Sequence, residues 1–212
     1  MRILIITTFY PPDTAIAAVR PYMFAKHLTQ RGHDVTVLRS GEFYNSASDF
    51  FDMSIPVRVI SYLGPDSPAE RYARGEQKDF PCVVSKNRLA KLPGWLSRLI
   101  LAAYSPINFR RRQRNIKIKI EKQKAALDAL RNEHFDVVFS TFGQQENIAA
   151  GQYAAKLFGC KLIQDFRDAV AVAPMCTPGQ FRFLRKIQTD AIKHADGVTA
   201  VSEGLRCELF EE

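Results

Sequence analysis

The sequence predicts an α/β protein with a Rossmann-like, doubly wound parallel sheet flanked by helices. Two observations support this. Short apolar runs alternate along the chain with helix-like segments, the rhythm of a parallel sheet whose strands are joined by crossover helices. These runs are unbroken and partly β-branched, which is typical of strands buried on both faces.

The first forty residues form one strand–loop–helix–strand unit. Residues 3–6 are uniformly apolar, and a loop with two prolines follows over residues 7–14. A helix is then indicated by Ala18, Tyr22, Ala25 and Leu28, which recur on one face of a 3.6-residue period. Gly32 is the expected cap, residues 35–38 are the second strand, and the crossover should be right-handed.

The remaining elements follow from the same patterns. Residues 64–81 read as irregular because they are rich in proline, glycine and charge. Two short amphipathic helices are expected between residues 89 and 103, ended by Pro106. A long helix is expected over residues 110–131, with a narrow apolar stripe. The stripe comprises Ile116, Ile120, Leu127 and Leu130. The other predicted elements are strands at 56–62, 135–140, 160–164 and 197–201, and helices at 146–158 (capped by Gly159), 181–194 and after Ser202.

The switch point of this sheet should lie between the first and fourth strands. In doubly wound sheets the ligand binds outside the carboxyl ends of the strands at that point. The loops at about residues 10–18 and 141–147 should therefore face each other across a crevice.

The net charge of +8 is unevenly distributed over the 212 residues. Residues 86–124 hold twelve Lys and Arg and a single acid, Glu121, so this segment carries +11 and the rest of the chain −3. This distribution points to a local anionic partner surface rather than to a protein that coats nucleic acid, and no nucleic-acid partner is expected.

Cysteine, histidine and hydropathy patterns favour a cytoplasmic protein. The four cysteines lie far apart without a C-x-x-C motif, so we expect reduced packing residues. The four histidines show no ligand spacing, and no metal is expected. No apolar run approaches a membrane span, and the amino terminus lacks the pattern of a signal peptide.

Five segments together resemble the N-terminal domain of a family 4 bacterial glycosyltransferase with the two-domain GT-B fold. They cover most of the chain in the right order, apart from about residues 41–134. The segments are M-R-I-L-I-I-T-T-F-Y-P-P-D (1–13), R-P-Y-M-F-A-K-H-L-T-Q-R-G-H-D-V-T-V-L (20–38), D-V-V-F-S-T-F-G (136–143), L-I-Q-D-F-R-D (162–168) and A-D-G-V-T-A-V-S-E-G-L (195–205).

The resemblance implies transfer of a sugar from a nucleotide-sugar donor to a hydroxyl, with retention and without a metal or other cofactor. The D-F-R-D segment is similar to that of members that act on envelope polysaccharides or lipid-linked sugars. In such enzymes a second domain, marked by E-x7-E, binds the donor. We therefore expect residues 1–212 to be a single acceptor-side domain, with a basic helical insertion at about 82–134. The donor domain would be absent through truncation, and the fragment inactive alone.

Candidate site residues come from position and from the resemblance. Asp168 is the expected catalytic carboxylate, near the reacting hydroxyl. The alternative for the charges at 165–168 is an internal arginine–carboxylate pair, because unpaired charges are costly to bury. Arg20 could face a phosphate or simply be solvated beside Pro21. The expected substrate-binding residues are Asp13, Thr14, Ala17, Arg20, Thr141, Phe142, Gln144, Asn147 and Arg167.

Several positions depart from the family pattern. Ala17 and Ala18 stand where members usually carry a Gly-Gly pair against the donor diphosphate. Asn147 replaces a frequent histidine, and Ala169 replaces the proline of D-R-D-P. These changes affect expectations about the donor and the chemistry rather than the fold.

The basic segment suggests docking on an anionic membrane, on its inner face. Trp95, Leu96 and Leu99 lie on an apolar helical face, and Arg110, Arg111, Arg112 and Arg114 follow. The alternative is that the apolar face packs on the domain and the arginines are solvated. Two other functions stay open: a non-catalytic basic module that binds membrane or nucleic acid, and a sugar-nucleotide epimerase of similar architecture.

Overall fold

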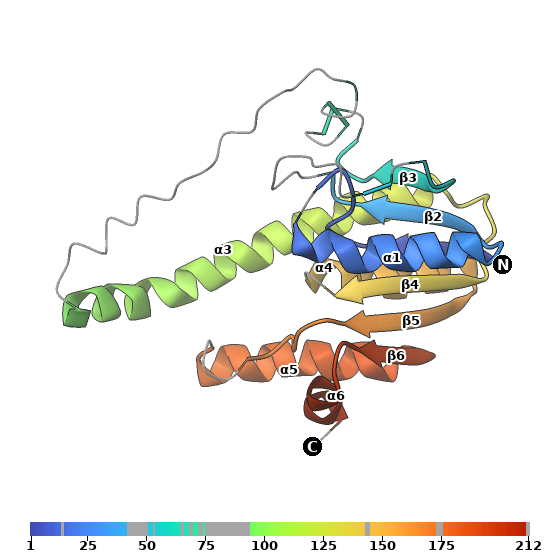
Figure 1. The fold of residues 1–212 in the computed structure, drawn as a ribbon. Coiled ribbons are helices and arrows are strands. Elements are labelled where there is room, and N and C mark those ends of the chain that lie inside the picture. Colours follow the sequence, from blue (N-terminus) through green and yellow to red (C-terminus); the bar gives the residue numbers. More distant parts are fainter. Residues whose placement is uncertain are drawn as a thin grey trace.

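A computed structural model gives the fold of the chain (Figure 1). It describes residues 1–13, 15–41, 51–52, 54–64, 66–67, 70–71, 74, 94–142, 145–172 and 176–210, with side chains omitted for 94–105.

Six parallel strands form one sheet in the order β3-β2-β1-β4-β5-β6. The strand order reverses between β1 and β4, which pair directly, so the expected switch point is confirmed. The strands are β1 (Arg2–Ile6), β2 (Asp34–Arg39), β3 (Arg58–Ser61), β4 (Val137–Phe142), β5 (Lys161–Phe166) and β6 (Gly197–Ala200).

Helices cover both faces of this sheet (Figure 1). Helix α1 lies on one face, while α3 and α4 lie on the other, and α5 and α6 follow at the β6 side. The first part of α3 extends past the carboxyl ends of the strands. The helices are α1 (Ile16–Gln30), α3 (Gly94–Asp128), α4 (Gln145–Phe158), α5 (Pro178–Lys193) and α6 (Glu203–Phe210).

The two faces of the strands build two separate apolar clusters. Alternate side chains of a strand point to opposite faces, so Ile3 and Ile5 pack with α1 residues such as Tyr22, while Leu4 and Ile6 pack with α3 residues such as Leu127. All four strand side chains are at least 96% buried. The prediction of strands covered on both faces is therefore confirmed.

The end of α1 follows from its sequence. Gly32 has φ +81°, and its N–H donates to the carbonyl of Thr29 while the N–H of His33 donates to that of Leu28. This is the Schellman arrangement, which needs a left-handed residue after the helix and explains the glycine.

Two features differ from the sequence-based expectation. Helix α3 is continuous through Pro106, so the helix end predicted at Pro106 is wrong. The first of the two short helices, with Leu89 and Leu92, lies outside the described residues. A proline inside a helix removes one hydrogen bond but leaves the flanking turns free to stay helical. In addition, β4 and β5 run on to Phe142 and Phe166, so Thr141 and Asp165 belong to strands rather than loops.

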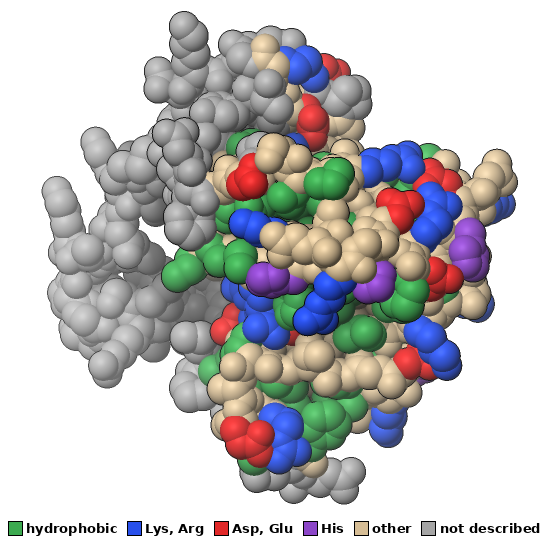
Figure 2. All heavy atoms as spheres, turned by 45° about the vertical axis from the view of Figure 1, so that its right-hand side comes forward, with side chains coloured by type: hydrophobic (Ala, Val, Ile, Leu, Met, Phe, Trp, Pro, Cys, Tyr) green, Lys and Arg blue, Asp and Glu red, His purple; other side chains and the backbone are tan. Residues whose placement is uncertain are grey.

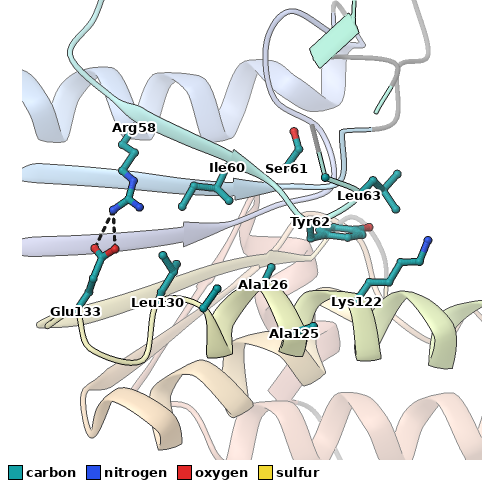
Figure 3. Close-up of a pocket in the computed structure, with 12 residues that line it drawn as sticks. Arg58, Ile60, Ser61, Tyr62, Leu63, Lys122, Ala125, Ala126, Leu130 and Glu133 are labelled. Carbon is teal, nitrogen blue, oxygen red and sulfur yellow. Dashed lines mark hydrogen bonds and ion pairs between the residues drawn. The ribbon is translucent and has the colours of Figure 1, made fainter. Parts of the chain in front are cut away.

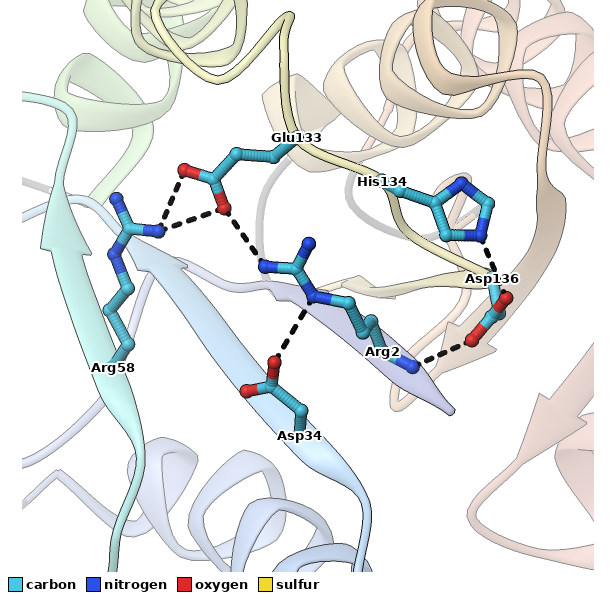
Figure 4. Close-up of polar contacts among 6 residues, drawn as sticks. All are labelled: Arg2, Asp34, Arg58, Glu133, His134 and Asp136. Carbon is cyan, nitrogen blue, oxygen red and sulfur yellow. Dashed lines mark hydrogen bonds and ion pairs between the residues drawn. The ribbon is translucent and has the colours of Figure 1, made fainter.

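The amino edge of the sheet is held by ion pairs within the protein (Figure 4). Arg58 binds both oxygens of Glu133 at 2.7 and 2.9 Å, and Arg2 binds Glu133 at 3.3 Å and Asp34 at 3.1 Å. These contacts tie three strands to the turn before β4. The pKa of Asp136 is lowered because its carboxylate accepts a hydrogen bond from the backbone N–H of Arg2.

The surface carries charged side chains of both signs, as expected for a sequence in which 25% of the residues are charged. Figure 2 shows one face on which basic and acidic side chains are interspersed. No helix in the described part of the chain is long and apolar enough to cross a membrane. Cys160, Cys176 and Cys207 are free thiols, while Cys82 lies outside the described residues.

Candidate active site

The site expected at the switch point lies where β1, β4 and β5 end and α1 begins. Parallel pairing brings the last residues of these strands into line: Ile6 lies beside Ser140, and Thr141 lies beside Asp165. Their carboxyl ends therefore present side chains at one edge of the sheet, together with the first turns of α1.

An arginine–carboxylate pair joins α1 to β5. The guanidinium of Arg20 donates to both carboxylate oxygens of Asp165, at 2.7 and 3.0 Å, and Thr199 donates to the same carboxylate at 2.7 Å. Asp165 is fully buried, whereas the Arg20 side chain is 31% exposed. The hydrogen bonds that Arg20 donates to Asp165 raise the pKa of Arg20. The internal pair considered from the sequence thus exists, but its arginine is Arg20 rather than Arg167.

Arg20 keeps some capacity for a ligand. Its Nε and Nη2 are used by Asp165, and its guanidinium carbon lies 5.1 Å from the centre of the Phe24 ring. Within the described residues its Nη1 has no partner. That group can still donate hydrogen bonds outward.

A proline inside α1 positions the second arginine. Pro21 has no N–H, so the carbonyl of Ala17, four residues earlier, lacks its helical donor. The Nη1 of Arg167 donates to that carbonyl at 3.0 Å. Arg167 is therefore held over the start of α1 by a backbone group that an ordinary helix would have used internally.

Asp168 follows directly and is exposed. Among the described residues it has no recorded hydrogen bond or ion pair, in contrast to buried Asp165. The next residue, Ala169, packs at the margin of the apolar cluster formed with Val170 and α5. The chain thus leaves one carboxylate free at the carboxyl edge beside a fixed arginine.

Asn147 is wholly internal. Its amide donates to Thr8 Oγ1 at 3.1 Å and to the carbonyl of Thr141 at 3.0 Å, and its oxygen accepts from Gln123 at 2.9 Å. It is fully buried, and it links the loop after β1 to β4 and α3. Sequence reasoning missed Gln123, although a polar residue inside an otherwise apolar helical stripe was the available signal.

The first loop is also fixed from inside. Buried Asp13 accepts the backbone N–H of Ala15 at 2.9 Å, just before α1. Arg39, another residue that sequence reasoning missed, donates to the Pro11 carbonyl and binds Glu70 at 2.6 Å. This buried arginine anchors the loop to the end of β2.

The remaining candidates divide by exposure. Phe142 is 8% exposed and packs against Phe166, and Ala17 is 9% exposed. Thr141 is 2% exposed, and its hydroxyl has no partner among the described residues. Thr14 and Gln144 lie outside those residues. The structure therefore brings Arg20, Arg167 and Asp168 to the accessible side of the edge and places most of the others beneath it.

In the part of the chain that the structure describes, no group of three or more His, Cys, Asp or Glu side chains could hold a metal ion. The chemistry available to the described side chains is hydrogen bonding, ion pairing and proton acceptance.

Comparison with known families identifies the chain. Residues 17–211 match the family described as glycosyl transferase 4-like domain. The match covers most of the chain, so the protein belongs to this family, and the predicted family and fold are confirmed. A comparison with curated proteins found no match.

One solved structure, described as "Structure of MT0777", aligns over 98% of this chain and 93% of its own. It shares 10% sequence identity and has a TM-score of 0.39. Similarity at this level carries no inference about function.

Proposed function

We propose that this domain is the acceptor-side half of a GT-B glycosyltransferase that moves a sugar from a nucleotide-sugar donor to an envelope polysaccharide or a lipid-linked acceptor, with retention and without a metal. The observation that supports this most is the free carboxylate of Asp168 beside the fixed guanidinium of Arg167. Both stand at the carboxyl edge of a sheet whose family transfers sugars.

Each exposed group has a role in this proposal. Asp168 accepts a hydrogen bond from the acceptor hydroxyl, which increases the nucleophilicity of its oxygen. That oxygen forms the new bond to the anomeric carbon on the same face of the sugar from which the nucleoside diphosphate departs, so the configuration is retained, and the hydroxyl proton passes to Asp168. Arg167 and the free Nη1 of Arg20 bind anionic groups of the acceptor.

The donor is held by a second domain across the cleft, as in other two-domain enzymes of this fold. Proximity and charge stabilisation both require the closed cleft. We therefore expect that the 212-residue chain alone transfers no sugar. Sugar transfer by the purified chain, at a rate that Arg167→Ala abolishes, would contradict this expectation.

The test uses protein from the complete coding sequence. It is incubated with UDP-, GDP- and dTDP-sugars and with polysaccharide or lipid-linked acceptors, and release of nucleoside diphosphate is measured. We expect acceptor-dependent release that EDTA does not reduce, and NMR of the product should show the donor's anomeric configuration. Inversion would refute retention, and release without any dependence on acceptor would refute the proposed function.

We further propose that α3 docks this domain on an anionic membrane. Arg110, Arg111, Arg112 and Arg114 are all exposed, and they lie on the part of α3 that extends past the carboxyl edge (Figure 1). The side chains of Trp95, Leu96 and Leu99 lie outside the described residues. The arginines attract anionic lipid head groups, and the exposed apolar side chain of Ile107 lies beside them. Stable peripheral binding requires these two contributions together.

A further inference from the structure

A groove of about 580 Å³ runs between β3 and the second half of α3 (Figure 3). Its β3 side is lined by Ile60, Tyr62 and Leu63. Its α3 side is lined by small residues, among them Ala125 and Ala129, which leave the space open. The volume falls in the range of about 300–1,000 Å³ that is usual for small-molecule sites.

The two ends of the groove differ in charge. At the amino edge the ion pair of Arg58 with Glu133 closes it with two neutralised groups (Figure 3). At the carboxyl edge Lys122 lies at the mouth, exposed and without an ion-pair partner among the described residues. The groove thus has mostly apolar walls between the ion pair at one end and Lys122 at the end nearest the candidate active site.

The same face of α3 continues beyond the mouth. Residues three and four apart on a helix are neighbours, so one face carries a continuous row from the groove to the overhanging part of α3. The row comprises Ile107, Arg111, Arg114, Ile118, Lys122, Ala125 and Ala129. Within this row Ile107 is 61% and Ile118 is 50% exposed, so apolar side chains alternate with basic ones along the exposed face.

We propose that this groove binds the hydrocarbon chain of a lipid-phosphate-linked acceptor, with the phosphate at Lys122. An apolar channel that ends at an unpaired cation matches an amphiphile with an apolar tail and an anionic head. The exposed isoleucines and arginines of the row connect the groove to the surface that meets the membrane. The inference rests on the proposed function and selects, of its two acceptor classes, the lipid-linked one.

The position relative to the active site fits such an acceptor. Neighbouring strands are spaced about 4.8 Å apart, so β3 ends about 10 Å from β1 and about 19 Å from β5, which Asp168 follows. A lipid-linked oligosaccharide whose phosphate lies at Lys122 can span this distance and bring a terminal hydroxyl to Asp168. The tail, the phosphate and the reacting hydroxyl would therefore be bound in sequence along one edge of the sheet.

The test measures binding of dodecyl phosphate below its critical micelle concentration by calorimetry, with the full chain. Dodecyl maltoside supplies the same tail with an uncharged head, and inorganic phosphate supplies the head alone. Ala125→Phe and Ala129→Phe fill the groove from exposed positions, so neither disturbs the core. Asn115→Phe adds the same side chain to exposed α3 outside the groove, and thermal melts confirm that each variant is folded.

Dodecyl phosphate should bind saturably, and each groove variant should weaken binding about tenfold or more, while Asn115→Phe has no effect. Lys122→Ala should weaken the binding of dodecyl phosphate but should leave the binding of dodecyl maltoside unchanged. Equal binding by wild type and both groove variants, or binding of inorganic phosphate alone with the same affinity, would overturn the proposal.

The groove and the proposed function can fail separately. Transfer to an acceptor without a lipid chain should survive Ala125→Phe, because that acceptor does not use the groove. If no sugar transfer is found but the groove variants still abolish dodecyl phosphate binding, the function is wrong and the lipid site stands. If transfer to a lipid-linked acceptor is unaffected by both groove variants, the lipid site is wrong and the function stands.

Discussion

At the residue scale, Pro21 is the clearest case of a locally unfavourable residue that serves the site. It lies inside α1 and leaves the Ala17 carbonyl without a helical donor. Arg167 donates a hydrogen bond to that carbonyl, which fixes its side chain next to Asp168 in the chain. A helix without the proline would bond internally and release the arginine.

Pro21→Ala should therefore have opposite effects on stability and activity. Proline inside a helix costs about 3 kcal/mol, against about 1 kcal/mol for the lost Arg167 bond and about 1 kcal/mol for the lost restriction of the unfolded chain. We expect a net gain of about 1 kcal/mol in a thermal melt, together with a fall in kcat for sugar transfer.

Pro106→Ala is the matched control, since it restores an N–H in α3 far along the chain from Arg167. It should leave transfer to a soluble acceptor unchanged. If Pro21→Ala leaves transfer unchanged as well, Arg167 does not depend on the Ala17 carbonyl for its role.

At the scale of elements, α4 approaches β4 closely because Gly151 faces Ser140. A Cβ at Gly151 would lie 2.6 Å from the Cβ of Ser140, closer than side chains can approach. Ser140 also binds α4 directly, because its hydroxyl donates to the Asn147 carbonyl at 2.7 Å. The strand and the helix therefore have little room to separate without losing that bond.

Gly151→Ala should destabilise the protein by about 1–3 kcal/mol in urea unfolding, the usual cost of overpacking a core. Gly179→Ala, in α5 with no heavy atom within 4 Å of the new Cβ, should instead stabilise by up to about 1 kcal/mol. If Gly179→Ala lowers the free energy of unfolding, or if Gly151→Ala leaves it unchanged, the surroundings described here for these two glycines are wrong.

The elements that sequence reasoning located well were those with an apolar period. The strands ending at Ile6 and Leu38 and the helix faces of α1 and α4 were predicted because burial repeats every two or 3.6 residues. Strand ends were missed where they carry polar side chains. Asp165 reads as a loop residue until Arg20 and Thr199 are seen bound to it, and Thr141 is a polar residue buried at the end of β4.

The position of the switch point was predictable, but the side-chain pairings around it were not. The switch point follows from strand order, which the alternating pattern gives. The partner of each arginine does not, because Arg20 and Asp165 are 145 residues apart and nothing local links them. The inward orientation of Asn147 likewise depends on Gln123 from a distant helix.

At the scale of the whole molecule, the two edges of the sheet differ in how their charges are used. At the amino edge, Arg2 and Arg58 are neutralised by Glu133 and Asp34 (Figure 4). At the carboxyl edge Asp168 is exposed, and the basic part of α3 extends past the strands on the same side (Figure 1). Acceptor binding and membrane contact are therefore proposed for one side of the molecule.

Membrane docking predicts charge-dependent binding to vesicles. The full chain should sediment with phosphatidylglycerol vesicles, not with phosphatidylcholine alone, and added salt should weaken binding. Changing Arg110, Arg111, Arg112 and Arg114 to Ser should lower the partition coefficient by roughly two orders of magnitude or more, at about 1 kcal/mol per charge.

The control changes four exposed basic residues elsewhere, Lys156, Arg182, Lys186 and Lys193, to Ser. It removes the same charge but should retain most of the binding. Equal losses in both variants would indicate non-specific attraction by net charge, and equal binding to neutral vesicles would rule out the docking proposal.

The central claim is that sugar transfer takes place at the carboxyl edge of the sheet, with Asp168 at the reacting hydroxyl. The most direct test compares kcat for transfer by the complete protein carrying Asp168→Asn or Asp34→Asn. Asp34 is an exposed aspartate at the amino edge whose surface ion pair with Arg2 is worth at most about 1 kcal/mol. We predict that Asp168→Asn lowers kcat by about 10²–10⁴-fold and that Asp34→Asn leaves it unchanged. Full activity in Asp168→Asn, or an equal loss in both variants, would contradict the claim.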